Sequence, residues 1–428
     1  MKQRALVVTL CFSLIALVLL GASQLTAPAR ANDAGPAALA AAALAAASQS
    51  RNTAEWNIEQ MDFESRYPNG FTFTLRASSS GGEIVSARVE WVHRPVLRAK
   101  EPLSVRRATG EIDPVTGLIT AVWEPTQSTA VPPWVGVYYR WRLRDAAGNE
   151  FVTEQAAAEY ADTSHAWQRT ETDEVLVFAN GLSEDIGDLV AAAMDAQRQK
   201  YLDGWGQALP YRPRVILFGD MATWLEWQVG HQDTSGLGLV RVGVTSDEWG
   251  GTVQVLYGTE EELAYGTVLH EVEHLYQREF LAGRTVFTPG WFIEGNATFY
   301  QLDDVHDVAT AYVADLVRRG ELPVLLQGEG PVTFGKNALH GYYIGYKFFE
   351  YLDRRWGIAI HRQIMELLAQ NMPFTEAIET ATGQSVIELE RAWREWLGAP
   401  GVVPTLIPTW TPPPFLASPT PMQFGSGK

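Results

Sequence analysis

The amino-acid sequence predicts an α+β protein, in which an all-β sandwich precedes a domain with a small mixed sheet and a helical C-terminal part. Three observations indicate this division. Residues 53–160 alternate apolar and polar side chains at period two, which is typical of half-buried strands. Beyond Glu174, short apolar runs alternate with segments of helical periodicity. After Glu294, helical periodicity predominates, which predicts helices at the C-terminal end of the second domain.

The N-terminal residues have the pattern of a secretory signal. Lys2 and Arg4 precede a nearly unbroken apolar run that ends at Gly21. We assign residues 1–31 to a signal peptide or, because the apolar run is slightly long for a signal core, to an uncleaved anchor. The chain's only cysteine, Cys11, lies here, so the mature protein would contain no disulfide. We therefore expect a secreted or extracytoplasmic protein, with attachment to the cell surface through this segment as the alternative.

The first folded part follows an Ala-rich segment, residues 32–52, which we interpret as a spacer. In the next region Phe71, Phe73 and Leu75 face one way, and two later segments repeat this alternation. Several short strands separated by Gly, Pro and Asn turns predict an immunoglobulin-like or fibronectin-like sandwich over residues 53–160. Such a domain could be a spacer, a cover for the second domain, a substrate-presenting module, or simply a packing partner.

The second predicted domain covers residues 165–398. Apolar runs at residues 175–178 and 215–218 predict buried strands, and Ser183 is the expected N-cap of a helix between them. A glycine-rich stretch follows, and either residues 240–244 or residues 253–257 would form the strand that edges a binding cleft. We favour the first, because glycines flank it and the second runs directly into the next helix.

That next helix carries the most informative motif of the chain, His270-Glu271-Val272-Glu273-His274. Two histidines four residues apart lie on the same face of a helix, so their imidazoles can share one metal ion, and Zn²⁺ accepts nitrogen ligands. Glu271 lies beside that face, within reach of a metal-activated water as general base. Thr259 and Glu262 predict the helix start, because they form a capping-box pair.

A zinc hydrolase needs a third protein ligand, and Glu294 is the candidate. It lies twenty positions after His274, which allows the helix to end and a second helix to return alongside. Its apolar neighbours indicate that its carboxylate is buried and paired. His306, which we expect at the surface near several aspartates, is the reserve ligand.

Two motifs carry a resemblance to a known family: His270-Glu271-x-x-His274 and Pro289-x-Trp291-x-x-Glu294-Gly295-x-Ala297. Over roughly residues 165–398 the chain resembles the gluzincin metallopeptidases, and within them the peptidase MA-like group. The resemblance implies a zincin-like catalytic domain, with His270, His274 and Glu294 as zinc ligands and Glu271 as base.

One position departs from that family. Thermolysin-type relatives carry an acidic residue four places after the ligand glutamate, where it orients one of the histidines. This chain has Thr298 at that place, so Asn296 or an acid elsewhere would have to substitute.

A peptidase also needs a hydrogen-bond donor for the developing oxyanion. Tyr342 aligns with a tyrosine of the family pattern, and His340, Tyr343 and Tyr346 are the other candidates. Tyr342 and Tyr346 share a helix face at four-residue spacing, but ordinary core tyrosines do so too.

The remaining C-terminal sequence predicts helices at about residues 307–319, 340–356 and 358–370, and two short helices that end near Leu397. Residues 399–428 are rich in Pro and Thr, which predicts a disordered tail.

The composition of the chain limits the classes of molecule that the protein is expected to bind. The formal net charge of −17 argues against nucleic acid, whose phosphates require a basic surface. No stretch beyond the N-terminal one is apolar for long enough to cross a membrane. We expect a peptide or protein substrate, and the sequence sets no oligomeric state. The predicted function is that of a secreted zinc metallopeptidase. The alternatives are a degenerate relative that binds zinc or peptide without turnover, and a cell-surface binding module.

Overall fold

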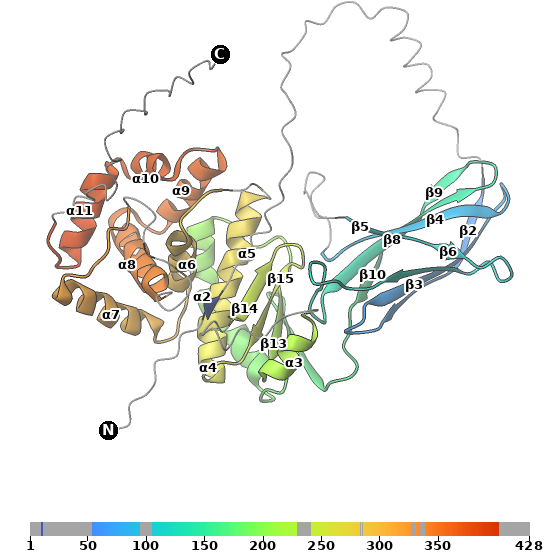
Figure 1. Ribbon diagram of the computed structural model, residues 1–428, viewed down its shortest axis with the longest axis horizontal. Coiled ribbons are helices and arrows are strands. Elements are labelled where there is room, and N and C mark those ends of the chain that lie inside the picture. Colours follow the sequence, from blue (N-terminus) through green and yellow to red (C-terminus); the bar gives the residue numbers. More distant parts are fainter. Residues whose placement is uncertain are drawn as a thin grey trace, which may run out of the picture.

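The computed structural model describes residues 10–11, 54–94, 105–228, 241–282, 284, 286–326, 331, 333 and 339–401. The expected α+β class is confirmed, since an all-β part and a part with a mixed sheet and helices lie next to each other (Figure 1). The predicted spacer and nearly all of the predicted signal segment and tail fall outside the described residues. Within the described ranges, no helix is long and apolar enough to span a bilayer.

Two antiparallel sheets form the N-terminal part, a four-stranded one in the order β2-β3-β7-β6 and a five-stranded one in the order β10-β8-β4-β5, with β9 paired to β8. Aromatic rings fill the space between them: Phe73 of the first sheet lies 5.4 Å from Trp91 and 4.9 Å from Tyr139 of the second, centroid to centroid. The strands are β2 (Trp56–Ser65), β3 (Phe71–Ser79), β4 (Ile84–Val92), β5 (Arg106–Thr109), β6 (Glu111–Ile112), β7 (Ile119–Trp123), β8 (Gly136–Asp145), β9 (Glu150–Val152) and β10 (Ala156–Glu159).

A six-stranded sheet in the order β1-β14-β15-β13-β12-β11 forms the base of the second part. β12, β13 and β15 are parallel, and β14 runs antiparallel to β15. β15 lies between β13 and β14, and β14 lies between β15 and the two-residue β1. Neither candidate edge is thus the outermost strand of the described sheet, although β14 is the nearer of the two to its end. The strands are β1 (Leu10–Cys11), β11 (Trp167–Glu171), β12 (Leu176–Asn180), β13 (Arg214–Phe218), β14 (Arg241–Ser246) and β15 (Gly251–Val255).

Helices make up the rest of the second part, mostly in its C-terminal half, as expected (Figure 1). They are α2 (Ile186–Trp205), α3 (Met221–Glu226), α4 (Glu260–Glu262), the π-helix η2 (Leu263–Val268), α5 (Leu269–Leu281), α6 (Gly290–Phe299), α7 (Val305–Arg319), α8 (Leu339–Trp356), α9 (Ala359–Ala369), α10 (Phe374–Thr382) and α11 (Val386–Trp396).

The expected cap of α2 is wrong. The helix begins later than predicted, and its N-cap is Asp185, whose side chain makes no capping hydrogen bond. Ser183 is used differently: its backbone N–H donates to Oε1 of Glu260 over 2.8 Å, and its hydroxyl donates to Oε2 of the same carboxylate. Ser183 therefore joins the starts of two helices instead of capping one.

The capping box that starts the motif helix is confirmed. The hydroxyl of Thr259 accepts from the backbone N–H of Glu262 over 3.1 Å, and Oε2 of Glu262 accepts from the N–H of Thr259 over 2.7 Å. The helical segment then passes through the π-helical turn η2 immediately before α5. Such turns shift the register of all following side chains, and they occur frequently at functional sites.

α6 and α8 approach each other backbone to backbone. A Cβ added at Gly345 would overlap the carbonyl of Trp291 and Cα of Gly295, so this contact requires glycine on both helices. The close approach brings the first half of α8 next to the residues of α6 that precede Gly295.

The two parts of the protein are also in direct contact. The indole of Trp134 stacks on Phe178 of β12 at 4.9 Å, and Arg214 of β13 donates to the carbonyl of Trp134 over 2.6 Å and to Glu159 of β10 over 2.7 Å. The sandwich is thus at least a packing partner of the second part.

Candidate active site

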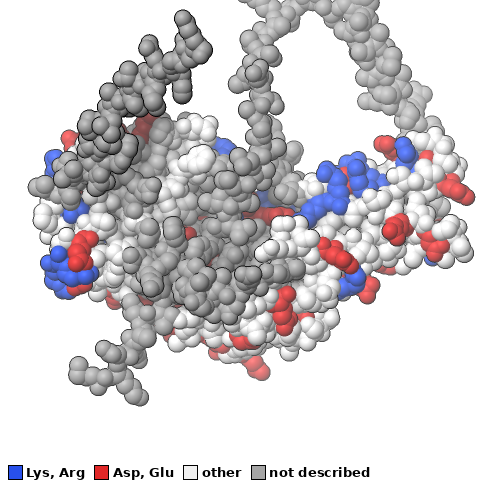
Figure 2. All heavy atoms as spheres, viewed as in Figure 1, with Lys and Arg blue, Asp and Glu red and all other residues white. Residues whose placement is uncertain are grey.

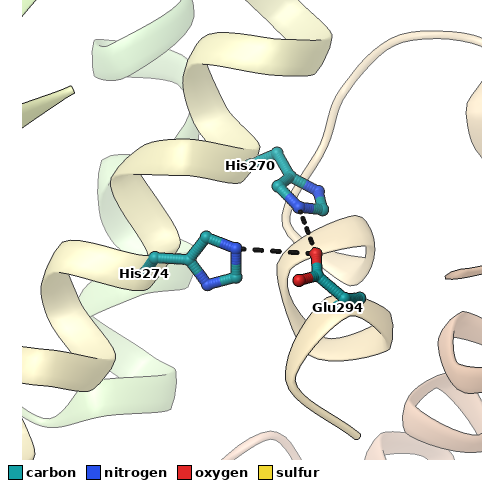
Figure 3. Close-up of side chains that lie close together, drawn as sticks. All are labelled: His270, His274 and Glu294. Carbon is teal, nitrogen blue, oxygen red and sulfur yellow. Dashed lines mark hydrogen bonds and ion pairs between the residues drawn. The ribbon is translucent and has the colours of Figure 1, made fainter. Parts of the chain in front are cut away.

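Three side chains from α5 and α6 converge in the interior of the second part. His270 and His274 extend from one face of α5, and Glu294 extends from α6 toward both (Figure 3). Oε2 of Glu294 lies 3.1 Å from Nε2 of His270 and 3.7 Å from Nε2 of His274. All three residues are buried, at 2%, 1% and 7% exposure.

This arrangement fits a single zinc ion. Ligand atoms about 2.0–2.1 Å from a tetrahedral zinc lie roughly 3.3 Å from one another, close to the two distances between Glu294 and the imidazoles. The donor atoms of the three residues all lie within 4.8 Å of one another. Nε2 of His274 is buried and has no hydrogen-bond partner among the described residues, which is costly unless something else satisfies it.

The pKa values of Glu294 and His274 are shifted because the carboxylate and the imidazoles lie close together in the interior. Burial alone would raise the pKa of Glu294, but the hydrogen bond with His270 and the nearby charge of His274 outweigh burial and lower this pKa to about 2. Burial would likewise lower the pKa of His274, yet its contacts with Glu273 and Glu294 raise it to about 10. Without a metal, Glu294 is therefore a carboxylate paired with a protonated His274, and a metal ion would bind these residues with release of the His274 proton.

Glu271, the expected general base, is held from strand β14. The hydroxyl of Thr245 lies 2.9 Å from the carbonyl oxygen of Glu271 and is also hydrogen-bonded to Oε2 of its carboxylate. The other oxygen, Oε1, is buried and has no hydrogen-bond partner within the described part of the chain. A Cβ at Gly243 would overlap Oε1, so the glycine provides the space in which this oxygen lies.

Thr298 stands where related peptidases have an acid that orients a histidine, and in this structure the acid next to His274 is Glu273. Nδ1 of His274 lies 3.3 Å from Oε2 of Glu273, which is completely buried. The amide of Asn296 donates to Oε1 of Glu273 over 2.6 Å and so fixes the carboxylate. Thr298 itself donates to the backbone carbonyl of Glu294 over 2.8 Å. The acid beside Nδ1 of His274 is thus Glu273 of the motif helix, which Asn296 holds, and its contact with His274 is a close ion pair without hydrogen-bond geometry.

His270 is supported by an amide. Its Nδ1 lies 3.3 Å from Oε1 of Gln301, and the Gln301 amide nitrogen lies 3.4 Å from Oδ1 of Asp303. Burial raises the pKa of Asp303 to about 6. The two imidazoles are thus oriented by different groups, one by a neutral amide and one by a carboxylate.

Of the oxyanion candidates, the structure brings Tyr342 to the cluster. Its ring stacks on the imidazole of His270, with centroids 5.7 Å apart. His340 instead meets Tyr312 edge-on at 5.6 Å, because two residues along a helix correspond to about 200° of rotation, away from the face of Tyr342. Tyr343 also lies against Tyr312, with ring centroids 5.3 Å apart.

The reserve ligand His306 lies elsewhere. Its ring stacks on Tyr346 at 4.4 Å, and its Nε2 lies 3.1 Å from the carbonyl oxygen of Thr298. The expectation of a surface position is wrong, because the ring is half-buried between α6, α7 and α8, and burial lowers its pKa. Among the described residues, the metal-ligating group consists of His270, His274 and Glu294 without it.

Three supporting residues had no role in the sequence-based interpretation: Gly243, Thr245 and Gln301. Gly243 and Thr245 were recognised only as part of a glycine-rich strand, and no local pattern links them to Glu271. Glu273 was visible as the fourth residue of the motif, and its position next to His274 was the available signal.

Comparisons with known proteins do not assign a family. No protein-family model matches the sequence, and no curated protein matches it. The structure has a TM-score of 0.31 and 11% identity with aminopeptidase A of Legionella pneumophila, covering 81% of this chain and 50% of that one. An M1 zinc metallopeptidase from Deinococcus radiodurans gives a TM-score of 0.29 and 13% identity, with 82% and 96% of the two chains covered.

An aminopeptidase N family protein from Idiomarina loihiensis gives a TM-score of 0.32 and 9% identity, over 82% of this chain and 74% of that one. The chain spans half the length of the Legionella enzyme. Scores at this level do not establish a shared fold, so the function is argued below from the site itself.

Proposed function

We propose that this chain is a zinc-dependent peptidase that hydrolyses peptide bonds with a metal-activated water. The observation that carries the proposal is the buried convergence of His270, His274 and Glu294, with donor atoms within 4.8 Å of one another. Two imidazoles and one carboxylate leave a fourth coordination position open, which distinguishes catalytic zinc sites from structural ones.

Zinc bound by these residues would lower the pKa of a water and polarise the scissile carbonyl. Glu271 is the proposed base: its Oε1 takes the proton from the attacking water and passes it to the leaving amine. Thr245 holds Oε2 of the same carboxylate, which keeps Oε1 directed away from the hydroxyl. Tyr342, stacked on His270, is the proposed donor to the oxyanion.

The finer assignment rests on the motifs. We propose that residues 165–398 form a zincin-like domain of the gluzincin class, similar to the peptidase MA-like group. In this proposal an extended substrate lies along β14, the strand that carries Thr245 and Gly243. The preceding sandwich is proposed to be an immunoglobulin-like or fibronectin-like accessory domain, and the protein to be secreted.

A peptide-library digest with and without a neutral chelator such as phenanthroline tests the proposal. We expect cleavage that chelator abolishes and that Glu271→Gln abolishes without loss of zinc. Glu261→Gln is the matched control, because Glu261 is exposed on the same helical segment.

The same measurements separate the alternatives. Stoichiometric zinc without cleavage of any peptide would identify a degenerate zinc-binding relative. Zinc-free protein, or full zinc occupancy in His270→Ala, would contradict the ligand assignment and favour a binding module.

A further inference from the structure

The outer face of the five-stranded sheet is densely covered with arginines. Strand alternation places them opposite the core residues of the same strands, such as Val89 and Trp141. Figure 2 shows Lys and Arg gathered along the upper edge of this part of the protein, with a few acidic side chains among them, although the net charge of the protein is −17. The patch consists of Arg88 on β4, Arg107 on β5, and Arg140, Arg142 and Arg144 on β8.

The buried carboxylate of Glu90 forms ion pairs with four of these five arginines. The side chain of Glu90 is 5% exposed, and it receives Arg142 at 2.9 Å, Arg88 at 3.2 Å, Arg140 at 3.3 Å and Arg107 at 3.4 Å. Four guanidinium groups around one carboxylate leave three positive charges uncompensated. Within the described residues, Arg144 has no ion pair.

Sheet register combines favourable and unfavourable pairs. Glu90 lies opposite Arg107 and Arg140, and Glu150 lies opposite Arg144. Arg88 and Arg142 are directly opposite each other on β4 and β8. Like charges at opposed cross-strand positions destabilise a sheet. The four arginines around Glu90 are nevertheless 42–54% exposed, so they can reach a partner from solvent. An anion bound between them would relieve their repulsion.

The patch is hollowed. A cavity of about 460 Å³ lies over β4, β8 and β9, and its lining includes Arg88, Arg142, Arg144 and Phe151. Glu150 is the acidic residue in that lining.

We propose that this face binds a short acidic peptide segment in an extended conformation. Arg140, Arg142 and Arg144 project from β8 at every second residue, a repeat of about 7 Å. An extended peptide with acidic residues at every second position has the same Cα repeat. In this structure Arg140 and Arg142 both contact Oε2 of Glu90, so they would turn from Glu90 to meet successive carboxylates of the peptide. Arginine binds carboxylates through two parallel hydrogen bonds, which favours this pairing over contacts with lysine.

The charge of the whole chain limits the length of the ligand. A long polyanion would extend over acidic surface and be repelled by it. At physiological salt, charges are screened beyond about 8 Å, so a short segment experiences mainly the local arginines. These properties favour a peptide segment over a nucleic acid or a long acidic polysaccharide.

Fluorescence anisotropy with a labelled peptide of about eight residues, in which Glu alternates with Thr, tests the proposal. The full chain carrying Glu271→Gln is used so that the peptide is not cut. Because the patch lies on the five-stranded sheet and the His-His-Glu cluster lies on α5 and α6, binding here does not depend on the proposed peptidase activity. A peptide with Gln in place of Glu, and one with the glutamates contiguous, are the comparison ligands.

We expect Arg144→Glu, and independently the pair Arg142→Ala with Arg144→Ala, to weaken binding about tenfold or more. Arg76→Glu, the same charge change on β3 of the other sheet, should alter it by less than about twofold. Equal loss in Arg76→Glu, or no binding by the parent chain, would overturn the site. Equal affinity for the contiguous peptide would overturn the register match. Stronger binding to anionic vesicles or heparin at equal charge would overturn the assignment to peptides.

Discussion

Oε2 of Glu273 lies 3.3 Å from Nδ1 of His274, and the two residues are neighbours in the chain. A histidine that binds a metal through one ring nitrogen commonly directs the other nitrogen at a carboxylate, which fixes the ring and strengthens the ligand. Glu273 is in turn fixed by the amide of Asn296, at 2.6 Å. Asn296 is only 1% exposed, so although it begins an Asn-x-Thr sequence it is not available for glycosylation.

Removing the charge of Glu273 should weaken zinc binding while the ligands remain. We expect Glu273→Gln to raise the zinc Kd about 10–100-fold, the range typical of groups that orient metal-binding histidines. Competition with a fluorescent zinc chelator measures this Kd without any assay of activity. The exposed Glu261→Gln is the control for lost negative charge on the same helical segment, and a Kd within about twofold of the parent for Glu273→Gln would remove its orienting role.

Loss of the Thr245 hydroxyl should lower kcat and leave zinc binding unchanged. Thr245→Val removes the hydrogen bond to Oε2 of Glu271 at nearly constant shape, and we expect kcat to fall about tenfold with zinc content unchanged. Thr245→Ser retains the hydroxyl and should recover most of the activity. If the valine and serine variants were equally active, Thr245 would be a packing residue only.

Sequence patterns predicted the strands, the helices and the motif His270-Glu271-x-x-His274, because these depend on periodicity and on residues within one or two helical turns. The start of α2 was misplaced since Ser183 makes a contact with Glu260, 77 residues away. Gln301 behind His270 was likewise invisible, because its contact depends on how α6 returns beside α5. Sequence patterns identify ligands by spacing, whereas the groups that orient them come from tertiary packing.

The glycine contact between α6 and α8 should be intolerant of even a methyl group. A Cβ at Gly345 would meet backbone atoms of Trp291 and Gly295, which cannot rotate away as a side chain can. We expect Gly345→Ala to lower the free energy of unfolding by about 1–3 kcal/mol, as overpacking does in cores. Urea unfolding measures the loss. Gln363→Ala on the exposed side of α9 should stay within about 0.5 kcal/mol of the parent, and a similar small effect for Gly345→Ala would show that the helices can separate freely.

A half-buried histidine that is paired with a buried aspartate, near the junction of the two parts, should make stability depend on pH. Nδ1 of His165 lies 2.8 Å from Oδ2 of Asp162, which is 2% exposed and also accepts from the indole of Trp167 over 2.8 Å. The hydrogen bond with Asp162 raises the pKa of His165 above its usual 6.5. A raised pKa means that the folded protein holds this proton more tightly than the unfolded chain does.

The stabilisation from His165 is therefore complete below about pH 6.5 and disappears as the pH rises through the raised value. We expect His165→Gln to lower the free energy of unfolding by about 1–2 kcal/mol at about pH 5.5, and by less at about pH 9, because the native imidazole loses its proton as the pH rises through the raised pKa. Urea unfolding of both proteins at the two pH values measures the difference. A loss of the same size at both values would mean that His165 stabilises the protein by packing, without a contribution from its charge.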